Sequence, residues 1–391
     1  MIGFILLPLI LITIYLLINI IKRYFKLINL NNKLLNIFIY VFLYFGIFIT
    51  TLAFFIEPSY IKNIFNRIGY LFIGFELYFV LSFIVIFAIY YFISKHNNSL
   101  KNNKYIKYLP LIISVLFTIS FSLYGVYNAH DLKVVKYDIN VNKDSNINSL
   151  NVVLLSDLHL GYNVGLKEIS EVVSEINANK PDVVLIAGDL FDNDFDSIYN
   201  PDEISNTLAK IKSKYGVYTT LGNHDVNEKI YLGFTFSWLN KSNPSINNEM
   251  KDFIDESNIN ILYDDFITIG DIQIYGRPDK VKINFNNNNR LDANEVLNKL
   301  DSTKPIIIVD HEPTDYELYK DMNVDLYLCG HTHDGQLFPL NLTSKLTWDN
   351  SSGYKKYENM HNIVTSGVGL YGIDMRTFTN AEICNILINF N

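Results

Sequence analysis

The chain has 391 residues, of which 49% are hydrophobic and 18% are charged, and its mean hydropathy is +0.14. This composition excludes an ordinary soluble protein, and it is too polar for a protein embedded entirely in a membrane. Residues 1–130 contain 10 basic and 2 acidic side chains, whereas the remainder contains 22 basic and 38 acidic ones. The acidic remainder argues against a nucleic-acid-binding face, so no nucleic acid partner is expected. Two cysteines, Cys329 and Cys384, are too few for a disulfide framework.

Four apolar stretches in residues 1–130 predict membrane-spanning helices. They run from Ile2 to Ile21, Leu34 to Ile56, Ile68 to Ile93 and Tyr108 to Ala129. Each reaches the roughly 20 residues that an α-helix needs to cross about 30 Å of hydrocarbon. Four buried helices of a globular core would have polar faces, and these stretches are apolar all round. The first stretch lacks a basic flank and a cleavage site of small residues, which argues against a cleaved signal peptide.

The distribution of basic residues predicts the orientation of the spans. They concentrate in the loop between the first two spans and in the loop between the last two, at Lys22, Arg23, Lys26, Lys33, Lys95, Lys101, Lys104 and Lys107. We expect these loops in the cytoplasm, and four crossings then place residues 131–391 outside it. Lys133, Lys136 and Lys143 follow the last span and weaken this asymmetry. The prediction is an integral, multi-pass membrane protein with an extracytoplasmic C-terminal part.

Glu76 is the one acidic residue inside these apolar stretches. Ionisable residues within membrane spans are candidates for a function. In the alternative, the third span begins at Leu77, which leaves enough residues up to Ile93 for a crossing and makes Glu76 interfacial. The sequence leaves the role of Glu76 open.

Residues 131–391 alternate between patterns of strands and patterns of helices. Residues 131–150 are predicted to be a linker with an edge strand. Apolar runs at 152–155, 183–187 and 217–221 alternate with helical spacing at 167–176 and 203–211, which predicts βαβ units with largely parallel strands. Residues 259–262 and 272–275 are predicted to pair as antiparallel strands, and further strands follow towards the C-terminus. Because helices come early and strands accumulate late, residues 151–391 predict a mixed α/β sandwich.

Five of the predicted strands end in residues that bind metal ions. In chain order these ends read Asp157-Leu158-His159, Gly188-Asp189-Leu190-Phe191-Asp192, Gly222-Asn223-His224-Asp225, Asp310-His311 and Gly330-His331-Thr332-His333. Side chains two residues apart on extended backbone point the same way, so Asp157 and His159 can reach one ion. Ligands of open α/β sheets bind beyond the carboxyl ends of the strands. One shared site is therefore a better explanation than five unrelated placements.

These motifs, in this order, resemble those of the calcineurin-like metallophosphoesterase superfamily from Asn151 onward. The resemblance implies an α/β fold, a four-layer sandwich of two mixed β-sheets flanked by helices, preceded here by an α-helical membrane domain of four spans. The run Gly330 to Gln336 with Pro339, then Ser366 to Gly369 and Met375-Arg376, is similar to a membrane-linked or exported branch that includes lipid-sugar pyrophosphatases. Asp334 and Ser366 stand where that branch often has Gly and Arg. Neither departure removes a metal ligand.

The resemblance also implies a site for two divalent metal ions. It assigns one ion to Asp157, His159, Asp189 and His333, and the other to Asp189, Asn223, His311 and His331. Such oxygen and nitrogen ligands suit Mn, Fe or Zn. The implied catalytic pair is His224, which contacts the phosphate and protonates the leaving oxygen, and Asp225, which positions it. Asp192 is expected to orient a ligand or to be a solvated loop carboxylate, and Arg277 to bind a distal phosphate or to close a turn.

The predicted function is a membrane-anchored hydrolase that cleaves a phosphate ester or pyrophosphate by attack of a metal-bridging hydroxide. A phosphorylated, lipid-linked substrate in the outer leaflet is expected, with the bilayer itself as the other partner. The choice between monoester, diester and pyrophosphate stays open, as do the metal and the oligomeric state. One alternative is a catalytically silent sensor or binding protein that uses the fold as a scaffold, against which the intact ligand set argues. A transporter with an enzymatic appendage would need polar residues in its spans, and only Glu76 qualifies.

Overall fold

The computed structural model describes residues 2–30, 32–97, 103, 105–231, 234–235, 245–280 and 290–390, without the side chains of 2–11, 13, 230 and 234–235. Within it the chain divides into two compact units. The helical unit comprises residues 1–127 with 231–237 and 372–375. The sheet unit comprises residues 128–230, 238–371 and 376–391.

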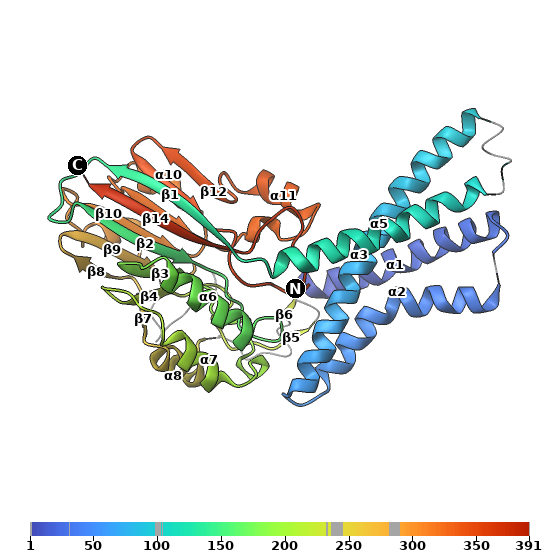
Figure 1. Ribbon diagram of the computed structural model, residues 1–391, viewed down its shortest axis with the longest axis horizontal. Helices are drawn as coiled ribbons and strands as arrows, with labels where there is room; N and C mark the ends of the chain where they lie inside the picture. The colour runs from blue at the N-terminus through green and yellow to red at the C-terminus, as the bar shows by residue number, and fades with distance from the viewer. Residues whose placement is uncertain are drawn as a thin grey trace. The chain divides into compact units, whose positions relative to one another are not determined.

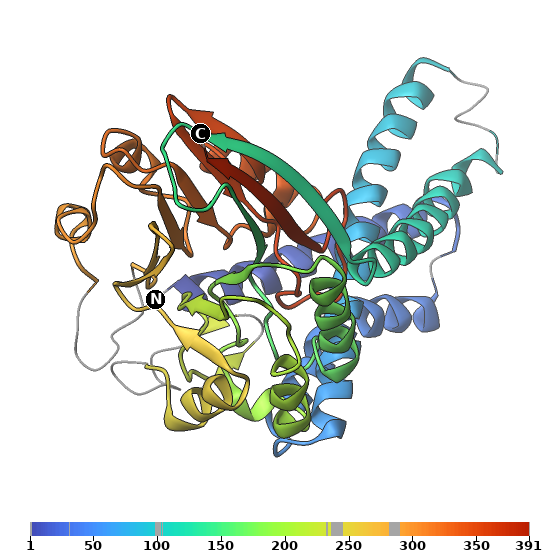
Figure 2. The ribbon, with the colours of Figure 1, turned by 60° about the vertical axis from the view of Figure 1, so that its left-hand side comes forward.

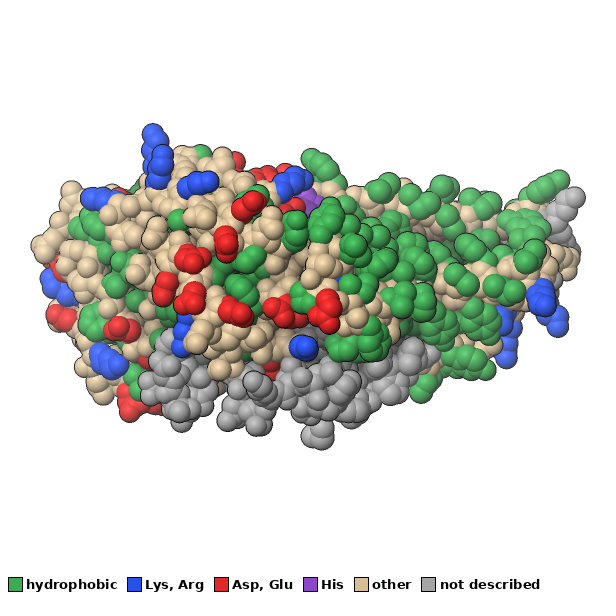
Figure 3. Space-filling view, turned by 90° about the horizontal axis from the view of Figure 1, so that it is seen from below, with side chains coloured by type: hydrophobic (Ala, Val, Ile, Leu, Met, Phe, Trp, Pro, Cys, Tyr) green, Lys and Arg blue, Asp and Glu red, His purple; other side chains and the backbone are tan. Residues whose placement is uncertain are grey.

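The helical unit is built from long helices (Figure 1). They are α1 (Ile2–Leu27), α2 (Lys33–Phe54), α3 (Tyr60–His96) and α5 (Leu109–Ala129), the last preceded by the short η1 (Ile106–Tyr108). Three helical stretches are long and apolar enough to cross a membrane, namely Lys33–Phe54, Tyr60–His96 and Ile106–Ala129. Hydrophobic side chains crowd the surface of these helices (Figure 3).

The expectation of four spans is supported only for three among the residues that the structure describes. The first expected span falls in α1, where the side chains of residues 2–11 and 13 lie outside the described set. Lys101 and Lys104, used above to orient the spans, also lie outside it. The fourth span and the orientation therefore stay predictions.

Helices α2 and α3 approach each other closely through small residues. A Cβ atom built on Gly46 would lie 3.0 Å from the carbonyl oxygen of Gly69, and one built on Gly69 would lie 3.0 Å from the backbone nitrogen of Thr50. Such small residues let two helices pack backbone to backbone in a membrane. The carboxylate of Glu76 lies at this contact, buried at 7% exposure, and its Oε1 accepts the Gly46 N–H at 3.3 Å. Glu76 therefore lies within a helix pair and not at a helix end.

The sheet unit contains two mixed six-stranded sheets (Figure 2). The first has the order β1-β14-β2-β3-β4-β7 and the second the order β12-β13-β11-β10-β9-β8. The first is built from β1 (Lys133–Val141), β14 (Glu382–Phe390), β2 (Ser149–Leu155), β3 (Val183–Ala187), β4 (Val217–Thr220) and β7 (Ile259–Ile261). The second is built from β12 (Gly353–Tyr357), β13 (Met360–Val364), β11 (Leu326–Cys329), β10 (Ile306–Asp310), β9 (Ile272–Arg277) and β8 (Asp265–Ile269). A separate pair is formed by β5 (Ile230–Tyr231) and β6 (Phe234–Thr235).

Alternation along the strands explains the layers of this unit. In β2, Val152 and Leu154 belong to a core shared with Ile307 and Leu328 of the second sheet. Their neighbours Val153 and Leu155 face the other way, into a core with α6 (Leu166–Ala178), α7 (Pro201–Leu208) and α8 (Asn248–Glu256). The outer face of the second sheet packs on α9 (Ala293–Leu297) and α10 (Tyr316–Lys320). Two mixed sheets flanked by helices, as expected, make up the unit.

Two details of strand pairing matter for the site. Strands β2, β3 and β4 are parallel to one another, as are β9, β10 and β11, so the carboxyl ends of each set meet at one edge of its sheet. The predicted antiparallel pairing of residues 259–262 with 272–275 is wrong. Strand β7 pairs in parallel with β4 in the first sheet, and β9 pairs antiparallel with β8 in the second.

Candidate metal centre

The seven predicted metal ligands follow five strand ends and come together. Asp157 and His159 follow β2, Asp189 follows β3 and Asn223 follows β4, while His311 follows β10 and His331 and His333 follow β11. The first sheet thus supplies four of the residues and the second sheet three. Five of the seven, Asp157, His159, Asp189, His331 and His333, have backbone φ angles between 45° and 71°. Non-glycine residues in this left-handed region cost about 1–3 kcal/mol each and cluster at functional sites.

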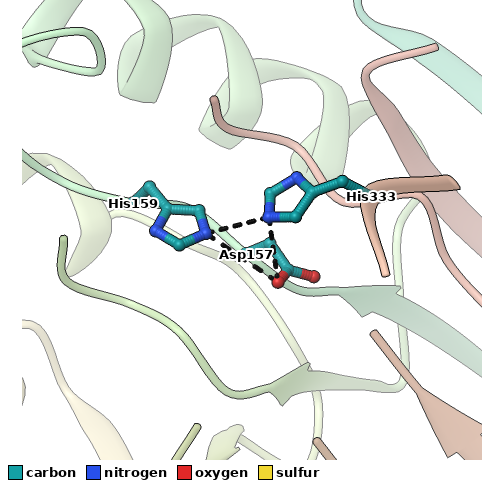
Figure 4. A group of neighbouring side chains, drawn as sticks. All are labelled: Asp157, His159 and His333. Carbon is teal, nitrogen blue, oxygen red and sulfur yellow. Dashed lines mark hydrogen bonds and ion pairs between the residues drawn. The ribbon is translucent and has the colours of Figure 1, made fainter. Parts of the chain in front are cut away.

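The first group of ligands is Asp157, His159 and His333 (Figure 4). The two Nε2 atoms of His159 and His333 lie 2.9 Å apart, and Nε2 of His333 lies 3.4 Å from Oδ1 of Asp157. All three side chains are almost completely buried. The other carboxylate oxygen of Asp157, Oδ2, accepts the main-chain N–H of His331 at 3.0 Å. Oδ1 is buried and has no hydrogen-bond partner among the described residues.

The second group is Asp189, His311 and His331, joined by Asn223. Nε2 of His311 lies 3.1 Å from Oδ2 of Asp189 and 3.0 Å from Oδ1 of Asn223. Nδ1 of His331 lies 3.0 Å from the same amide oxygen. Oδ2 of Asp189 also lies 3.8 Å from Nε2 of His159, so this carboxylate stands between the two groups.

The tautomer of His311 shows that this donor set fits a cation. Its Nδ1 lies 2.7 Å from the main-chain oxygen of Ala187, and a carbonyl oxygen only accepts, so Nδ1 carries the proton. In the neutral ring Nε2 then carries a lone pair, which faces a carboxylate oxygen of Asp189 and the amide oxygen of Asn223. Three acceptors would then meet here, and either a bound cation or a second proton on Nε2 would make their contact favourable. Burial alone would lower the pKa of His311, but the carboxylates of Asp189, Asp157 and Asp279 together outweigh burial and raise this pKa well above its usual value.

Two glycines of the motifs are required by this close packing. A Cβ atom on Gly222 would lie 2.2 Å from Oδ1 of Asp189, and one on Gly330 would lie 2.6 Å from Oδ2 of Asp157. Real contacts are never so short, so any side chain at these positions displaces a carboxylate of the site.

His224 and Asp192 form a third group, together with His159. Oδ1 of Asp192 lies 3.8 Å from Nδ1 of His224 and 3.7 Å from Nδ1 of His159. Asp192 is 4% exposed, which contradicts the alternative of a solvated loop carboxylate. The main-chain N–H of His224 donates to Oδ1 of Asp189 at 2.8 Å, and its side chain is 15% exposed, so it lies at the open side of the site.

Asp225 is used differently from the expected positioning of His224. Its carboxylate accepts the main-chain N–H groups of Gly222, Asp189 and Phe191 at 2.7, 2.9 and 3.1 Å. It thereby ties together the two loops that carry Asn223 and Asp189. Burial and the nearby Asp189 carboxylate raise the pKa of Asp225 to about 7, although the N–H groups of Gly222 and Phe191 oppose this. The side chain that faces His224 is Asp192.

Arg277 is buried, and its guanidinium is engaged by other residues of the chain. It is 2% exposed, donates to the Tyr319 hydroxyl and the Leu291 carbonyl, and pairs with Asp264 at 3.5 Å. These are ordinary hydrogen bonds, as in the alternative that Arg277 closes a turn, but their partners lie 42 and 14 residues away in the sequence. Arg290, which sequence reasoning missed, holds Asp310 through two hydrogen bonds of 2.9 and 2.7 Å, directly before His311. Its neighbours in sequence, Asn286 to Asn289, gave no signal, and they lie outside the described residues.

Tyr371 was also missed. Its ring centroid lies 4.8 Å from that of His224 and 5.6 Å from that of His159. Gln336 holds its main chain from both sides, accepting its N–H at 3.0 Å and donating to its carbonyl at 3.1 Å. Asp334 has a φ of 47°, in the left-handed region that favours glycine, which explains why similar proteins often have glycine at this position. No pattern in the sequence indicates Tyr371, because the residue belongs to none of the motifs.

Buried carboxylates and imidazoles gathered at the strand ends of a four-layer sandwich define a metal-dependent phosphoesterase scaffold. The profile of the calcineurin-like phosphoesterase family matches residues 150–335. The chain is 31% identical over 281 residues to an uncharacterized metallophosphoesterase of Campylobacter jejuni, covering 70% of this chain and 67% of that protein. It therefore belongs to the calcineurin-like metallophosphoesterase family.

Two further relatives extend this likeness. A Danio rerio protein named transmembrane protein with metallophosphoesterase domain is 32% identical over 284 residues, or 71% of this chain. The alignment spans only 62% of that protein's length. An uncharacterized metallophosphoesterase of Aquifex aeolicus is 28% identical over 273 residues, 68% of this chain and 96% of its own length.

Proposed function

We propose that this protein is a membrane-anchored phosphoesterase with two divalent metal ions, which hydrolyses a phosphate ester or pyrophosphate. The observation that carries the proposal is the convergence of acceptor atoms on Asp189. One carboxylate oxygen lies 3.1 Å from Nε2 of His311 and 3.8 Å from Nε2 of His159, with each imidazole in a different ligand group. Asp157, His159, Asp189 and His333 would hold one ion, and Asp189, Asn223, His311 and His331 the other. Mn, Fe or Zn suits these oxygen and nitrogen donors.

When bound, such ions neutralise phosphoryl oxygens and lower the pKa of water. The chain's own residues orient the reaction. The Nδ1–H···O=C bond from His311 to Ala187 fixes that imidazole in the ligating tautomer. Asp225 fixes the loops of Asp189 and Asn223 through three main-chain N–H groups. His224 is placed to donate a proton to the leaving oxygen, and Asp192 stabilises its protonated form.

A lipid-linked substrate is the second part of the proposal. It is supported by the three apolar helices and by the name of the Danio rerio relative. Only three residues, 130–132, separate α5 from β1. A substrate held in the same bilayer meets the site at a high effective concentration.

The test is hydrolysis by the purified full-length protein in lipid nanodiscs, loaded separately with Mn²⁺, Zn²⁺ or Fe²⁺. Nitrophenyl phosphate, bis-nitrophenyl phosphate and a polyprenyl pyrophosphate represent the monoester, diester and pyrophosphate substrates. Turnover that needs added metal and is abolished in Asp189→Asn supports the proposal. Two bound ions per chain in the wild type without turnover of any substrate would instead support a silent scaffold.

A further inference from the structure

Arg376 is a completely buried arginine to which the proposed mechanism gives no role. It is 0% exposed and is among the largest fully buried side chains of the described residues. Its Nη2 lies 2.9, 3.1 and 2.8 Å from the main-chain oxygens of Ser366, Gly367 and Gly369. Its Nη1 donates to the main-chain oxygen of Asn380 at 2.8 Å and lies 3.3 Å from the Thr379 hydroxyl. The planar guanidinium presents several N–H donors in fixed directions to these carbonyl oxygens, which the ammonium group of lysine does not do.

The segment 366–369, whose carbonyl oxygens accept from Arg376, packs directly on the turn that carries Asp157. The N–H of Gly369 donates to the main-chain oxygen of Asp157 at 2.7 Å, and the N–H of Val368 donates to that of Ser156 at 3.0 Å. A Cβ atom on Gly369 would lie 2.1 Å from the Leu158 oxygen, so the two backbones are in full contact. The hydrogen bonds therefore run from Arg376 through Gly369 to Asp157, which is held at a φ of 55°.

Arg376 also reaches a second member of the same ligand group. Its Nη2 lies 3.3 Å from Nδ1 of His333. The next residue, Thr377, supports the turn after His333, since its N–H donates to the Gln336 oxygen at 3.0 Å and its hydroxyl accepts the Phe338 N–H at 2.8 Å. The second ligand group is fixed by other contacts, namely Ala187 on His311 and Asp225 on the Asp189 loop.

We propose that Arg376 is a positioning residue for one of the two metal groups, that of Asp157, His159 and His333. The inference rests on the proposed two-metal function. Loss of the guanidinium should release the 366–369 segment and the His333 turn together, while Asp189, Asn223, His311 and His331 keep their supports. Residues that orient metal ligands typically contribute about 10- to 100-fold to metal affinity. The expected result is a protein that loses one ion selectively.

The experiment compares full-length wild type with Arg376→Met and Arg376→Lys. Zinc per chain is counted by elemental analysis after equilibration at a series of buffered Zn²⁺ concentrations, and folding is followed by circular dichroism. Arg376→Met should stay folded, keep one ion with wild-type affinity and bind the other at least about tenfold more weakly. Arg376→Lys keeps the charge but not the planar fork, and should recover only part of that affinity.

Arg277→Met is the matched control, because Arg277 is equally buried but contacts Tyr319 and Asp264 instead of the metal groups. It should lose thermal stability and keep two ions. Two ions with unchanged affinity in Arg376→Met, or equal weakening of both ions, would overturn the inference. If wild type itself binds fewer than two ions, the proposed function fails first. Where Arg376→Met is unfolded at 25 °C, the comparison is made with Arg376→Lys alone, and native affinity for both ions there overturns the inference.

Discussion

Nε2 of His311 lies 3.1 Å from Oδ2 of Asp189, and the proton on Nδ1 of His311 is already committed to the Ala187 carbonyl. A neutral His311 would present a lone pair to this carboxylate, so a second proton on the ring or a bound cation makes the contact favourable. The fold brings them together from different sheets, since Asp189 follows β3 of the first and His311 follows β10 of the second. A cation held between them would link the two sheets at the carboxyl ends of their strands.

Asp189→Asn should remove most of the bound metal and lower turnover by several orders of magnitude. The amide keeps the size of the side chain but cannot supply a shared anionic oxygen to both groups, on which the two-ion arrangement depends. Metal per chain and turnover are measured on the same preparation. Asp252→Asn, an exposed change on α8, is the control and should alter neither. Two ions per chain with near-native turnover in Asp189→Asn would contradict the assignment.

His224→Ala should keep both ions while kcat falls by about 10²–10⁴, the usual contribution of a positioned acid or base. The loss should shrink for a nitrophenolate leaving group, which departs without a proton. Asp192→Asn should show the same dependence on the leaving group to a smaller extent, because its carboxylate lies 3.8 Å from Nδ1 of His224. Equal losses for good and poor leaving groups would argue against the acid role.

The location of the site was predictable from the sequence, whereas its supports were not. Apolar runs that end in Asp, His or Asn mark strand ends, and parallel strands bring such ends together, which is why the ligand residues were found. Arg290, Tyr371 and the Ala187 carbonyl contact the site from positions distant in the sequence or through a main-chain atom. Neither kind of contact produces a recognisable sequence pattern. The Asp225 carboxylate accepts three main-chain N–H groups, and its adjacency to His224 in the sequence does not reveal these partners.

Arg290→Ala should destabilise the protein by about 3–5 kcal/mol, the usual cost of leaving one member of a buried ion pair alone. Arg290 holds the fully buried Asp310 with two hydrogen bonds and Asp315 at 2.7 Å. Thermal unfolding of the full-length protein, followed by circular dichroism, measures the change. Arg290→Ala combined with Asp310→Asn should recover part of the loss, and no recovery would mean that the pair is not the cause.

Asp271 gives a prediction of pH dependence outside the metal site. The Ser145 hydroxyl, at 2.6 Å, and Lys304, at 3.0 Å, lower the pKa of Asp271 to about 2 against the opposing effect of burial. A carboxyl with a depressed folded-state pKa contributes stability above its unfolded-state value near 3.9, and that contribution is lost as the pH falls towards 2. Asp271→Asn should therefore lower the melting temperature at pH 6, and the gap from wild type should narrow from pH 4 to pH 3. A gap that stays constant over this range would exclude the carboxylate as its source.

The orientation of the chain determines which substrates can reach the site. If the basic loops are cytoplasmic, residues 131–391 lie outside the cytoplasm and meet outer-leaflet lipids, lipid-linked sugar phosphates or polyprenyl phosphates rather than soluble cytoplasmic nucleotides. Protease added to intact cells should then cleave the sheet unit, and a reporter fused after Asn391 should be active only if it functions outside the cytoplasm. Changing Lys133, Lys136 and Lys143 to Gln should strengthen this orientation, because these residues oppose the charge asymmetry. A C-terminus shielded from protease, together with a reporter active in the cytoplasm, would leave the phosphoester chemistry intact. It would, however, redirect the search for a substrate to inner-leaflet lipids and nucleotide-linked intermediates.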